Sequence, residues 1–319
     1  MPNMAYEFGG LLVRCPLELY GLEVAARHVA RNADISINVD VGTMPIRRPV
    51  TFDWKGRFQL TLEGGGSAGW TIRYRDEVAI QCDPRGRMLN CICRGEGQME
   101  VLTEILLRRV LPRLTALHGR LPVHAAALDN GEGAVLIFGH SGVGKSTLTA
   151  AMAASGWDIM SDDMSILSLP GSQDARPQVW QTSPGVSLWE ASRHALELPF
   201  DQCRAIEGYD GKYWFAPPCT ARANPSTVGA IVFLSGAVAN DIFWQRVTGP
   251  QALVMAGMQM VQFDPTNRTE GQTALVSFTR LVGQIPCYTL TYPRRYGVLP
   301  RVIETITALQ SDARSRAHL

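Results

Sequence analysis

The 319-residue sequence has almost no excess of charge of either sign. It holds 30 Lys and Arg residues against 29 Asp and Glu residues, which leaves a formal net charge of +1 at pH 7. Proteins whose main partner is a nucleic acid or an anionic membrane surface carry a strong positive field. The charge balance therefore argues against both kinds of partner.

Long hydrophobic runs are also missing. No uncharged apolar stretch approaches the roughly 18–20 residues that cross a bilayer, and residues 1–10 lack the basic and apolar regions of a signal peptide. We therefore expect a cytoplasmic protein without a membrane-spanning segment.

The cysteines form no recognisable framework. The seven are scattered and include no C-x-x-C pair, which argues against a disulfide scaffold and against a zinc ribbon. A strand would place Cys91 and Cys93 on one face. We expect reduced cysteines that pack as small apolar side chains.

The composition is that of a globular protein, with 46% apolar and 18% charged residues, and no internal repeat is apparent. Apolar and polar residues alternate in several short segments between residues 11 and 81, separated by Gly, Pro and Asp. This pattern predicts a small antiparallel strand unit. From about 98 to 117 the apolar period becomes helical, with Pro112 as a kink.

From residue 121 the pattern becomes that of an α/β protein. Continuous apolar runs at 134–138 and 229–234 predict strands buried on both faces. A further strand is expected at 286–292, with helices at 144–155 and 300–310. We therefore divide the chain into a strand-rich N-terminal domain that ends in a helix, residues 1–120, and an α/β domain, residues 121–319.

A glycine-rich segment follows the first buried strand and fits G-x-x-x-x-G-K-[ST] without a mismatch. Its residues are Gly139, His140, Ser141, Gly142, Val143, Gly144, Lys145, Ser146 and Thr147. Such a loop turns successive backbone N–H groups and the positive end of a helix toward a phosphate. Lys145 is expected to reach the β- and γ-phosphates and Ser146 to ligate Mg²⁺. The alternative is a chance glycine-rich turn.

Two carboxylates follow the next predicted strand. Asp162 and Asp163 follow residues 157–160 after one serine, Ser161, where they can face a triphosphate, hold Mg²⁺ and accept the proton of an attacking hydroxyl. A solvated acidic turn is the alternative interpretation. His124 lies among small apolar residues before the first buried strand, and taken alone it is typical of a packed core histidine.

The combination of His124, the loop GHSGVGKST and the Asp162-Asp163 pair resembles the catalytic domain of HPr kinase/phosphorylase, a P-loop group akin to phosphoenolpyruvate carboxykinase. The resemblance is specific over about residues 121–170. It implies that His124, Lys145 and the acidic pair form an active centre, with Asp163 as the base for a seryl hydroxyl. Asp162 then assists or binds the metal ion together with Ser146.

The sequence departs from that family in two places. The Arg-Gly-Leu-Gly-containing segment after the acidic pair is not apparent, so the resemblance does not extend to the phosphorylase activity or to HPr as the substrate. Residues 1–120 do not resemble the α/β domain that precedes many of those enzymes. The layout is closer to shorter HPr-kinase-related proteins, some of which phosphorylate a ribosomal precursor peptide such as that of a lasso peptide.

Other charged residues are weaker candidates for the site. Lys212 lies in a glycine-rich, aromatic segment, residues 207–214, that can close over ATP or a peptide. Glu190 is a candidate second metal ligand. Arg222 and the Arg294-Arg295 pair are candidate phosphate contacts, although solvated surface charges are the commoner explanation for each.

We expect an ATP- and Mg²⁺-dependent kinase that transfers the γ-phosphoryl group to a serine of a small protein or peptide. The same residues leave two alternatives open, namely a kinase of a small hydroxyl compound, or a non-catalytic nucleotide-dependent switch that binds a peptide. The resemblance also implies a homo-oligomer.

Overall fold

The computed structural model of the protein describes residues 4–22, 24–25, 32–55, 58–171, 175–206, 210–217 and 224–317. By its internal contacts the chain divides into one unit made of residues 1–120 with 262–272, and a second made of residues 121–261 with 273–319. The division expected from the sequence differs from this by the segment 262–272. The mixed α/β class, with several sheets, is confirmed.

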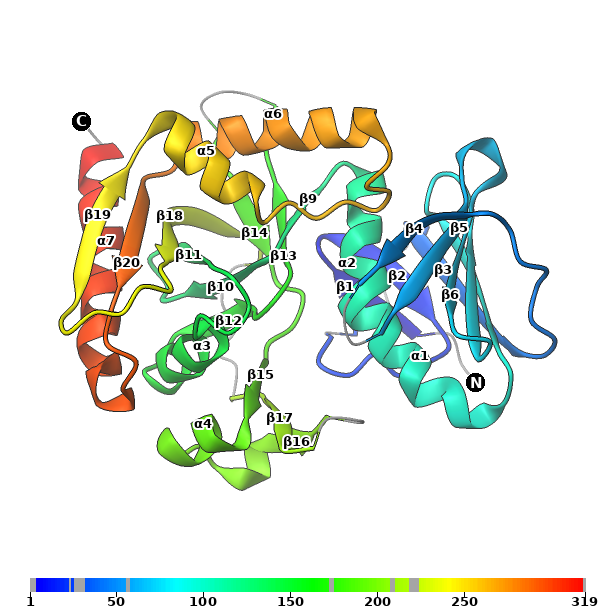
Figure 1. Ribbon diagram of the computed structural model, residues 1–319, viewed down its shortest axis with the longest axis horizontal. Coiled ribbons are helices and arrows are strands. Elements are labelled where there is room, and N and C mark those ends of the chain that lie inside the picture. The colour runs from blue at the N-terminus through cyan, green and yellow to red at the C-terminus, as the bar shows by residue number, and fades with distance from the viewer. Residues whose placement is uncertain are drawn as a thin grey trace. The chain divides into compact units, whose positions relative to one another are not determined.

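The first unit is built on an eight-stranded sheet of order β1-β2-β3-β8-β7-β6-β5-β4 (Figure 1). The strands are β1 Met4–Phe8, β2 Leu11–Cys15, β3 Ile35–Val41, β4 Val50–Trp54, β5 Leu60–Gly64, β6 Trp70–Tyr74, β7 Val78–Cys82 and β8 Met88–Cys93. The strands β4 to β8 form an antiparallel meander. Both Cys91 and Cys93 are buried on β8, as expected.

The expectation of a purely antiparallel unit is wrong at β3. This strand runs parallel to β2 on one side and to β8 on the other. After β3 the chain passes to the opposite edge of the sheet, where β4 begins, so the strands that pair with β3 are not both its neighbours in sequence. Alternation identifies a strand, but it does not identify a long-range partner.

A single interrupted helix follows the sheet. It consists of α1 Met99–Ile105, a π-helical segment Leu106–Val110, α2 Leu111–Leu114 and a 3₁₀ turn Thr115–His118. Proline cannot donate to the preceding turn and its ring crowds the carbonyl there, so the wider π-helical turn lies directly before Pro112. The helix and its irregularity agree with the sequence prediction.

The segment 262–272 belongs to the first unit because of one aromatic side chain. Phe263 is fully buried, and its ring meets those of Trp54 and Trp70 edge-on, with centroids 5.7 and 5.0 Å apart. Glu270 accepts the backbone N–H groups of residues 263 and 264, at 2.5 and 3.0 Å. Packing of Phe263 thus attaches the segment to the first unit, and the hydrogen bonds of Glu270 hold the segment's own conformation.

The second unit contains a nine-stranded sheet. Its main path is β12-β10-β11-β18-β14-β13-β9, and β20 pairs with β18 and with β19. The strands are β9 Leu121–Val123, β10 Ala125–Asp129, β11 Ala134–Phe138, β12 Asp158–Ser161, β13 Ser165–Ser168, β14 Gln178–Trp180, β18 Ser226–Leu234, β19 Phe243–Val247 and β20 Cys287–Thr291. The strands β11, β18 and β20 are parallel.

Helices cover both faces of this sheet (Figure 1). The helices of the unit are α3 Lys145–Ala154, α4 Glu190–Ala195, α5 Gly249–Gly257, α7 Leu299–Ala317 and the part of α6 Arg268–Gln284 that follows residue 272. Along β11, Val135 and Ile137 pack in one core with α3 and α7. Leu136 and Phe138 pack in another with α5 and α6. Burial on both faces explains why this strand is continuously apolar.

A small three-stranded sheet completes the second unit. It has the order β15-β17-β16, with β15 Val186–Trp189, β16 Cys203–Ala205 and β17 Lys212–Phe215. The guanidinium of Arg193 on α4 lies 5.1 Å from the ring centre of Phe200 and 5.4 Å from that of Tyr213. Short 3₁₀ turns occur at Gly66–Ala68, Glu96–Gln98, Phe200–Gln202 and Tyr296–Val298.

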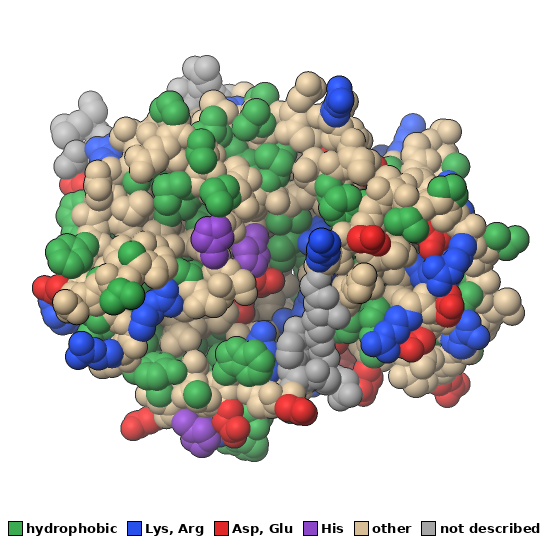
Figure 2. All heavy atoms as spheres, in the orientation of Figure 1, with side chains coloured by type: hydrophobic (Ala, Val, Ile, Leu, Met, Phe, Trp, Pro, Cys, Tyr) green, Lys and Arg blue, Asp and Glu red, His purple; other side chains and the backbone are tan. Residues whose placement is uncertain are grey.

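The surface reflects the balanced composition. Acidic and basic side chains are interspersed on the face drawn in Figure 2. No helix among the described residues is long and apolar enough to span a bilayer.

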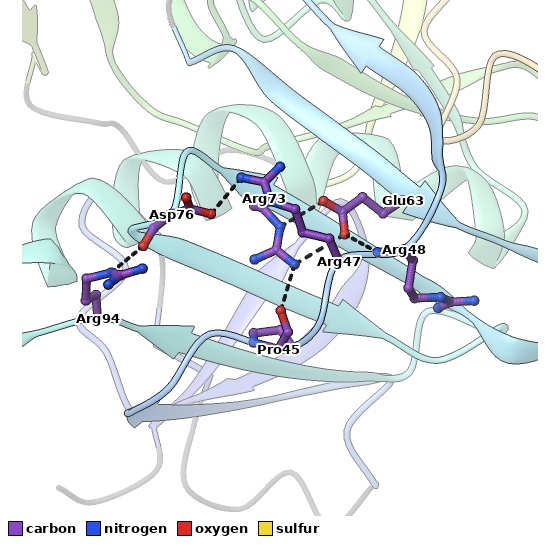
Figure 3. A network of polar contacts seen from close by, with 7 residues as sticks. All are labelled: Pro45, Arg47, Arg48, Glu63, Arg73, Asp76 and Arg94. Atoms are coloured by element: carbon purple, nitrogen blue, oxygen red, sulfur yellow. Dashed lines mark hydrogen bonds and ion pairs between the residues drawn. The ribbon is translucent and has the colours of Figure 1, made fainter.

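A buried ion pair joins β5 and β6 inside the first sheet (Figure 3). The side chains of Arg73 and Glu63 are 1% and 0% exposed. Arg73 donates to both carboxylate oxygens of Glu63, at 2.8 and 3.2 Å, and to the carbonyl of Pro45 at 3.1 Å. Burial alone raises the pKa of Glu63, but hydrogen bonds from Arg73 and from the Arg48 amide overcome it, and the net pKa is lowered.

We expect Glu63→Gln to destabilise this sheet by about 3 kcal/mol, because it leaves a buried guanidinium without its counter-charge. Amide hydrogen exchange in β5 and β6 should then accelerate about a hundredfold. The matched control is Asp76→Asn, which removes the partner of Arg47 from a pair that is 59% and 60% exposed and should change exchange little. Equal effects of the two substitutions would contradict the importance of burial.

Candidate active site

The sheet of the second unit brings three separate parts of the sequence to one edge. Ala125 of β10 lies opposite Phe138, the last residue of β11. On the other side of β10, Ala127 lies opposite Ser161, the last residue of β12. His124, the glycine-rich loop and the Asp162-Asp163 pair therefore begin or end their strands at the same edge.

The glycine-rich loop, residues 139–147, connects β11 to α3. Gly142 and Gly144 have φ angles of 78° and 94°, which side chains other than glycine rarely adopt. Lys145 begins the helix. The expected strand, loop and helix therefore occur at the expected residues.

Lys145, His124 and Asp163 form a continuous chain of polar contacts. The Lys145 Nζ donates to the carbonyl of Gly139 at 2.6 Å and lies 3.2 Å from Nε2 of His124. The Nδ1 of His124 lies 3.2 Å from Oδ1 of Asp163. With Lys145 protonated, Nε2 accepts and Nδ1 carries the hydrogen that points to Asp163. The sequence-based association of these three residues is thus seen in their contacts.

Burial controls the electrostatics of the lysine. Lys145 is only 7% exposed, and burial lowers the pKa of its ammonium, while the negative charges of Asp163 and Asp162 oppose that shift. A buried cation that is only partly compensated favours the approach of an anion. The site is therefore suited to a negatively charged group.

The two aspartates occupy different environments. Asp162 is buried, and its Oδ2 accepts the amide N–H of Ser187 at 2.9 Å, which ties the loop after β12 to the start of β15. The Asp163 side chain is 66% exposed. Asp163 is consequently the carboxylate that another molecule can reach.

Contacts from distant parts of the chain complete the site. The backbone N–H of His124 donates to the carbonyl of Gln259 at 2.9 Å. Arg294 Nη1 donates to the carbonyls of Val143 and Gly142, at 2.6 and 3.4 Å. The sequence marked Arg294 only as a weak candidate and gave no sign of the role of Gln259, since neither belongs to a local motif.

The remaining candidates are distributed as follows. Ser146 is half-buried in the first turn of α3, and Ser141 is exposed. Lys212 lies at the start of β17 with its ammonium 5.6 Å from the ring centre of Trp189, so its assignment to a phosphate stays a prediction. Glu190 approaches Arg193 and His194 of its own helix, at 3.8 and 3.6 Å. Arg222 and residues 207–209 lie outside the described residues.

Comparison with known proteins gives little beyond this geometry. No family model matches the chain, and no curated protein matches it. A solved structure of the Hpr(Ser) kinase/phosphatase from Coxiella burnetii is similar with a TM-score of 0.32 and 12% sequence identity, over 60% of this chain and 98% of that chain. This similarity is too low to carry an argument, so what the site can do has to be inferred from its own residues.

Within the described part of the chain, no group of three or more His, Cys, Asp or Glu side chains is arranged to hold a metal ion. Mg²⁺ commonly binds through one or two carboxylates together with substrate phosphates and water. The hydroxyl of Ser146 and one carboxylate of the Asp162-Asp163 pair fit that smaller share of the ligands.

The glycines of the loop should differ in their tolerance of substitution. A Cβ on Gly139 would lie 2.6 Å from Cγ1 of Val143, whereas a Cβ on Gly142 would meet nothing within 4 Å. We expect Gly139→Ala to cost about 2 kcal/mol through overpacking and Gly142→Asn less than about 1 kcal/mol, because Asn tolerates the left-handed conformation. Thermal unfolding of the two variants measures this, and the reverse order would contradict the packing at Gly139.

Proposed function

We propose that the protein is an ATP- and Mg²⁺-dependent kinase that transfers the γ-phosphoryl group to the hydroxyl of a serine in a small protein or ribosomal precursor peptide. The observation that carries the proposal is the chain of contacts from the glycine-rich loop through Lys145 and His124 to Asp163. It places a cation, an imidazole and an exposed carboxylate in succession.

Phosphoryl transfer asks a protein mainly to position groups and to neutralise charge. The backbone N–H groups at the start of α3 and the ammonium of Lys145 supply the positive side of the site. In the structure Lys145 donates to Gly139 and contacts His124. These are contacts to neutral groups, which a phosphate oxygen can replace at small cost.

Asp163 fits the role of general base. The acceptor oxygen forms a bond to the γ-phosphorus, the bond from that phosphorus to the β,γ-bridging oxygen breaks, and ADP leaves. The proton of the acceptor hydroxyl passes to the Asp163 carboxylate. His124 contacts Oδ1 of Asp163 at 3.2 Å and thereby orients the carboxylate, so we assign His124 a positioning role.

Bound Mg²⁺ would supply charge neutralisation at the β- and γ-phosphates. Ser146 and Asp162 or Asp163 are the residues we assign to hold it. Lys145, next to Ser146 in the chain, is linked to Asp163 through contacts of 3.2 Å on either side of His124, which brings the acidic pair near the start of α3.

The exposure of Asp163 favours a macromolecular acceptor. Enzymes that phosphorylate small compounds enclose the substrate in a pocket, whereas the Asp163 side chain is 66% exposed. A serine presented on a peptide or on the surface of a small protein can reach such a base. This observation carries the choice of acceptor over a small hydroxyl compound.

A substitution of Asp163 should affect the rate of phosphoryl transfer but not the affinity for ATP. We expect Asp163→Asn to lower the rate of phosphoryl transfer by a factor of about 10²–10⁴ and to change the affinity for ATP less than about threefold. Incubation with labelled ATP and candidate acceptors, followed by mass spectrometry, measures the first, and calorimetry the second.

The matched control is Asp241→Asn, which removes an exposed carboxylate paired with Arg301 in the same unit and should leave transfer unchanged. Near-normal turnover of the Asp163 variant would show that another group is the base. ATP binding without transfer to any serine-containing acceptor, in the unaltered protein, would favour a nucleotide-dependent switch.

The pH dependence of ATP binding should report on Lys145. Binding requires the ammonium, and burial lowers the pKa of Lys145 below that of an ordinary lysine, so affinity should fall at a lower pH than an ordinary lysine would give. Because the pKa of Lys145 is lower in the folded state than in the unfolded state, its deprotonation makes the folded state more stable as pH rises. Unfolding caused by Lys145 therefore cannot explain a loss of ATP affinity at high pH. Calorimetry between about pH 7 and 10 checks the expectation.

Lys145→Arg is the informative comparison, since a guanidinium stays charged throughout that range. The variant should show weaker binding at neutral pH but no further decline toward pH 10. A parallel decline of both proteins would mean that another group titrates.

A further inference from the structure

A pocket lies beside the glycine-rich loop and is lined in part by Gly142, Gly144 and Thr147. It has a volume of about 240 Å³. Its lining residues are Gly142, Gly144, Thr147, Tyr292, Arg294, Arg295, Tyr296 and Leu299. All belong to the second unit, and none of His124, Lys145 or Asp163 is among them.

Two residues in the first turn of α3 point in different directions, Lys145 toward His124 and Thr147 toward the pocket. In an α-helix successive residues are about 100° apart, so Thr147 lies about 200° around the axis from Lys145. Lys145 points to His124, whereas Oγ1 of Thr147 lies 3.1 Å from Oγ of Ser192, which is 3.4 Å from the hydroxyl of Tyr296. Thr147 therefore connects the loop to the wall of the pocket.

The other wall of the pocket is formed by the end of β20 and the start of α7. A Cβ built on Gly144 would lie 3.5 Å from both Nη1 of Arg294 and the hydroxyl of Tyr292. Tyr292 is 7% exposed and Tyr296 is 40% exposed. The pocket thus offers one fixed aromatic ring and one partly uncovered ring beside the loop.

The lining is chemically selective. It combines two tyrosines, two arginines and a leucine, and it contains no carboxylate. Aromatic faces stack on nucleobases, and guanidinium groups favour an anionic or electron-rich ligand. A planar, partly polar group attached to a phosphate matches this lining better than an aliphatic or cationic group.

We propose that this pocket receives the nucleoside of a nucleoside triphosphate, with the base against Tyr296. This inference rests on the proposed function, in which the last phosphate of the triphosphate lies near Lys145 and Asp163. The nucleoside is attached at the other end of the triphosphate, so it needs a binding site beside the loop but away from those two residues. Thr147, Tyr292 and Tyr296 are then binding residues, and Arg294 keeps the pocket wall attached to the loop through the carbonyl of Val143.

The decisive comparison uses ATP and inorganic triphosphate, which share the phosphates but not the nucleoside. We expect Tyr296→Ala to raise the Kd for ATP about tenfold, as loss of one base-stacking ring does, and to leave the Kd for triphosphate unchanged. Tyr296→Phe keeps the ring and should retain the affinity for ATP. Lys145→Ala should weaken both ligands.

Hydrogen exchange of the unaltered protein gives a second, independent test. ATP should slow exchange in residues 139–147 and in 292–299, whereas triphosphate should slow it in 139–147 alone. Equal protection of 292–299 by the two ligands would overturn the nucleoside assignment while leaving the phosphate site in place.

The remaining results of these experiments would separate a failure of the nucleoside assignment from a failure of the proposed function. An equal loss of ATP and triphosphate affinity in Tyr296→Ala, or no loss of either, would overturn the assignment. A raised KM for the acceptor with an unchanged Kd for ATP would assign the pocket to the acceptor instead. Failure of the unaltered protein to bind either ATP or triphosphate would overturn the proposed function itself.

Discussion

The candidate site depends on the antiparallel pairing of β10 with two neighbours at once. Because β10 pairs with both β11 and β12, the residue before it and the residues after the other two strands must lie at the same edge. A shift of one residue in either register would turn His124 or the acidic pair to the other side of the strand. Alternate residues of β11 pack into two different cores, so the same strand pairing that fills both cores also holds the polar contacts at this end of the sheet.

Charged side chains gather at the same edge, and the burial of Lys145 strengthens the electrostatic interactions between them. Lys145 is buried and contacts the carbonyl of Gly139 and the imidazole of His124, and the charges of Asp163 and Asp162 act on it electrostatically. Asp162 is held by the Ser187 amide, so it is fixed before any ligand arrives, whereas Asp163 faces solvent. A side chain that is already held needs no rearrangement before a ligand binds, whereas an exposed side chain is accessible to another molecule. The two aspartates thus differ in their partners. Asp162 accepts a hydrogen bond from the backbone of β15, and Asp163 contacts His124.

Much of this arrangement is visible in the sequence because it is local. The glycine-rich loop lies between a strand and a helix, and both are identified by apolar runs of the right length. What the sequence misses depends on contacts between distant segments. The parallel pairing of β3, the return of Phe263 to the first sheet and the contact of Arg294 with Val143, 151 residues away, have no signature within a window of one element. Arg294 therefore could not be distinguished from a solvated arginine.

Arg294 also shows how a side chain from a distant part of the sequence can orient a peptide of the glycine-rich loop. In a planar trans peptide the C=O of one residue and the N–H of the next point in opposite directions. By accepting Arg294 at 2.6 Å, the carbonyl of Val143 turns the N–H of Gly144 away from the guanidinium. Gly144 adopts a φ of 94°, and a Cβ there would meet Arg294 and Tyr292 at ordinary contact distance. Conformation rather than space therefore requires glycine at this position.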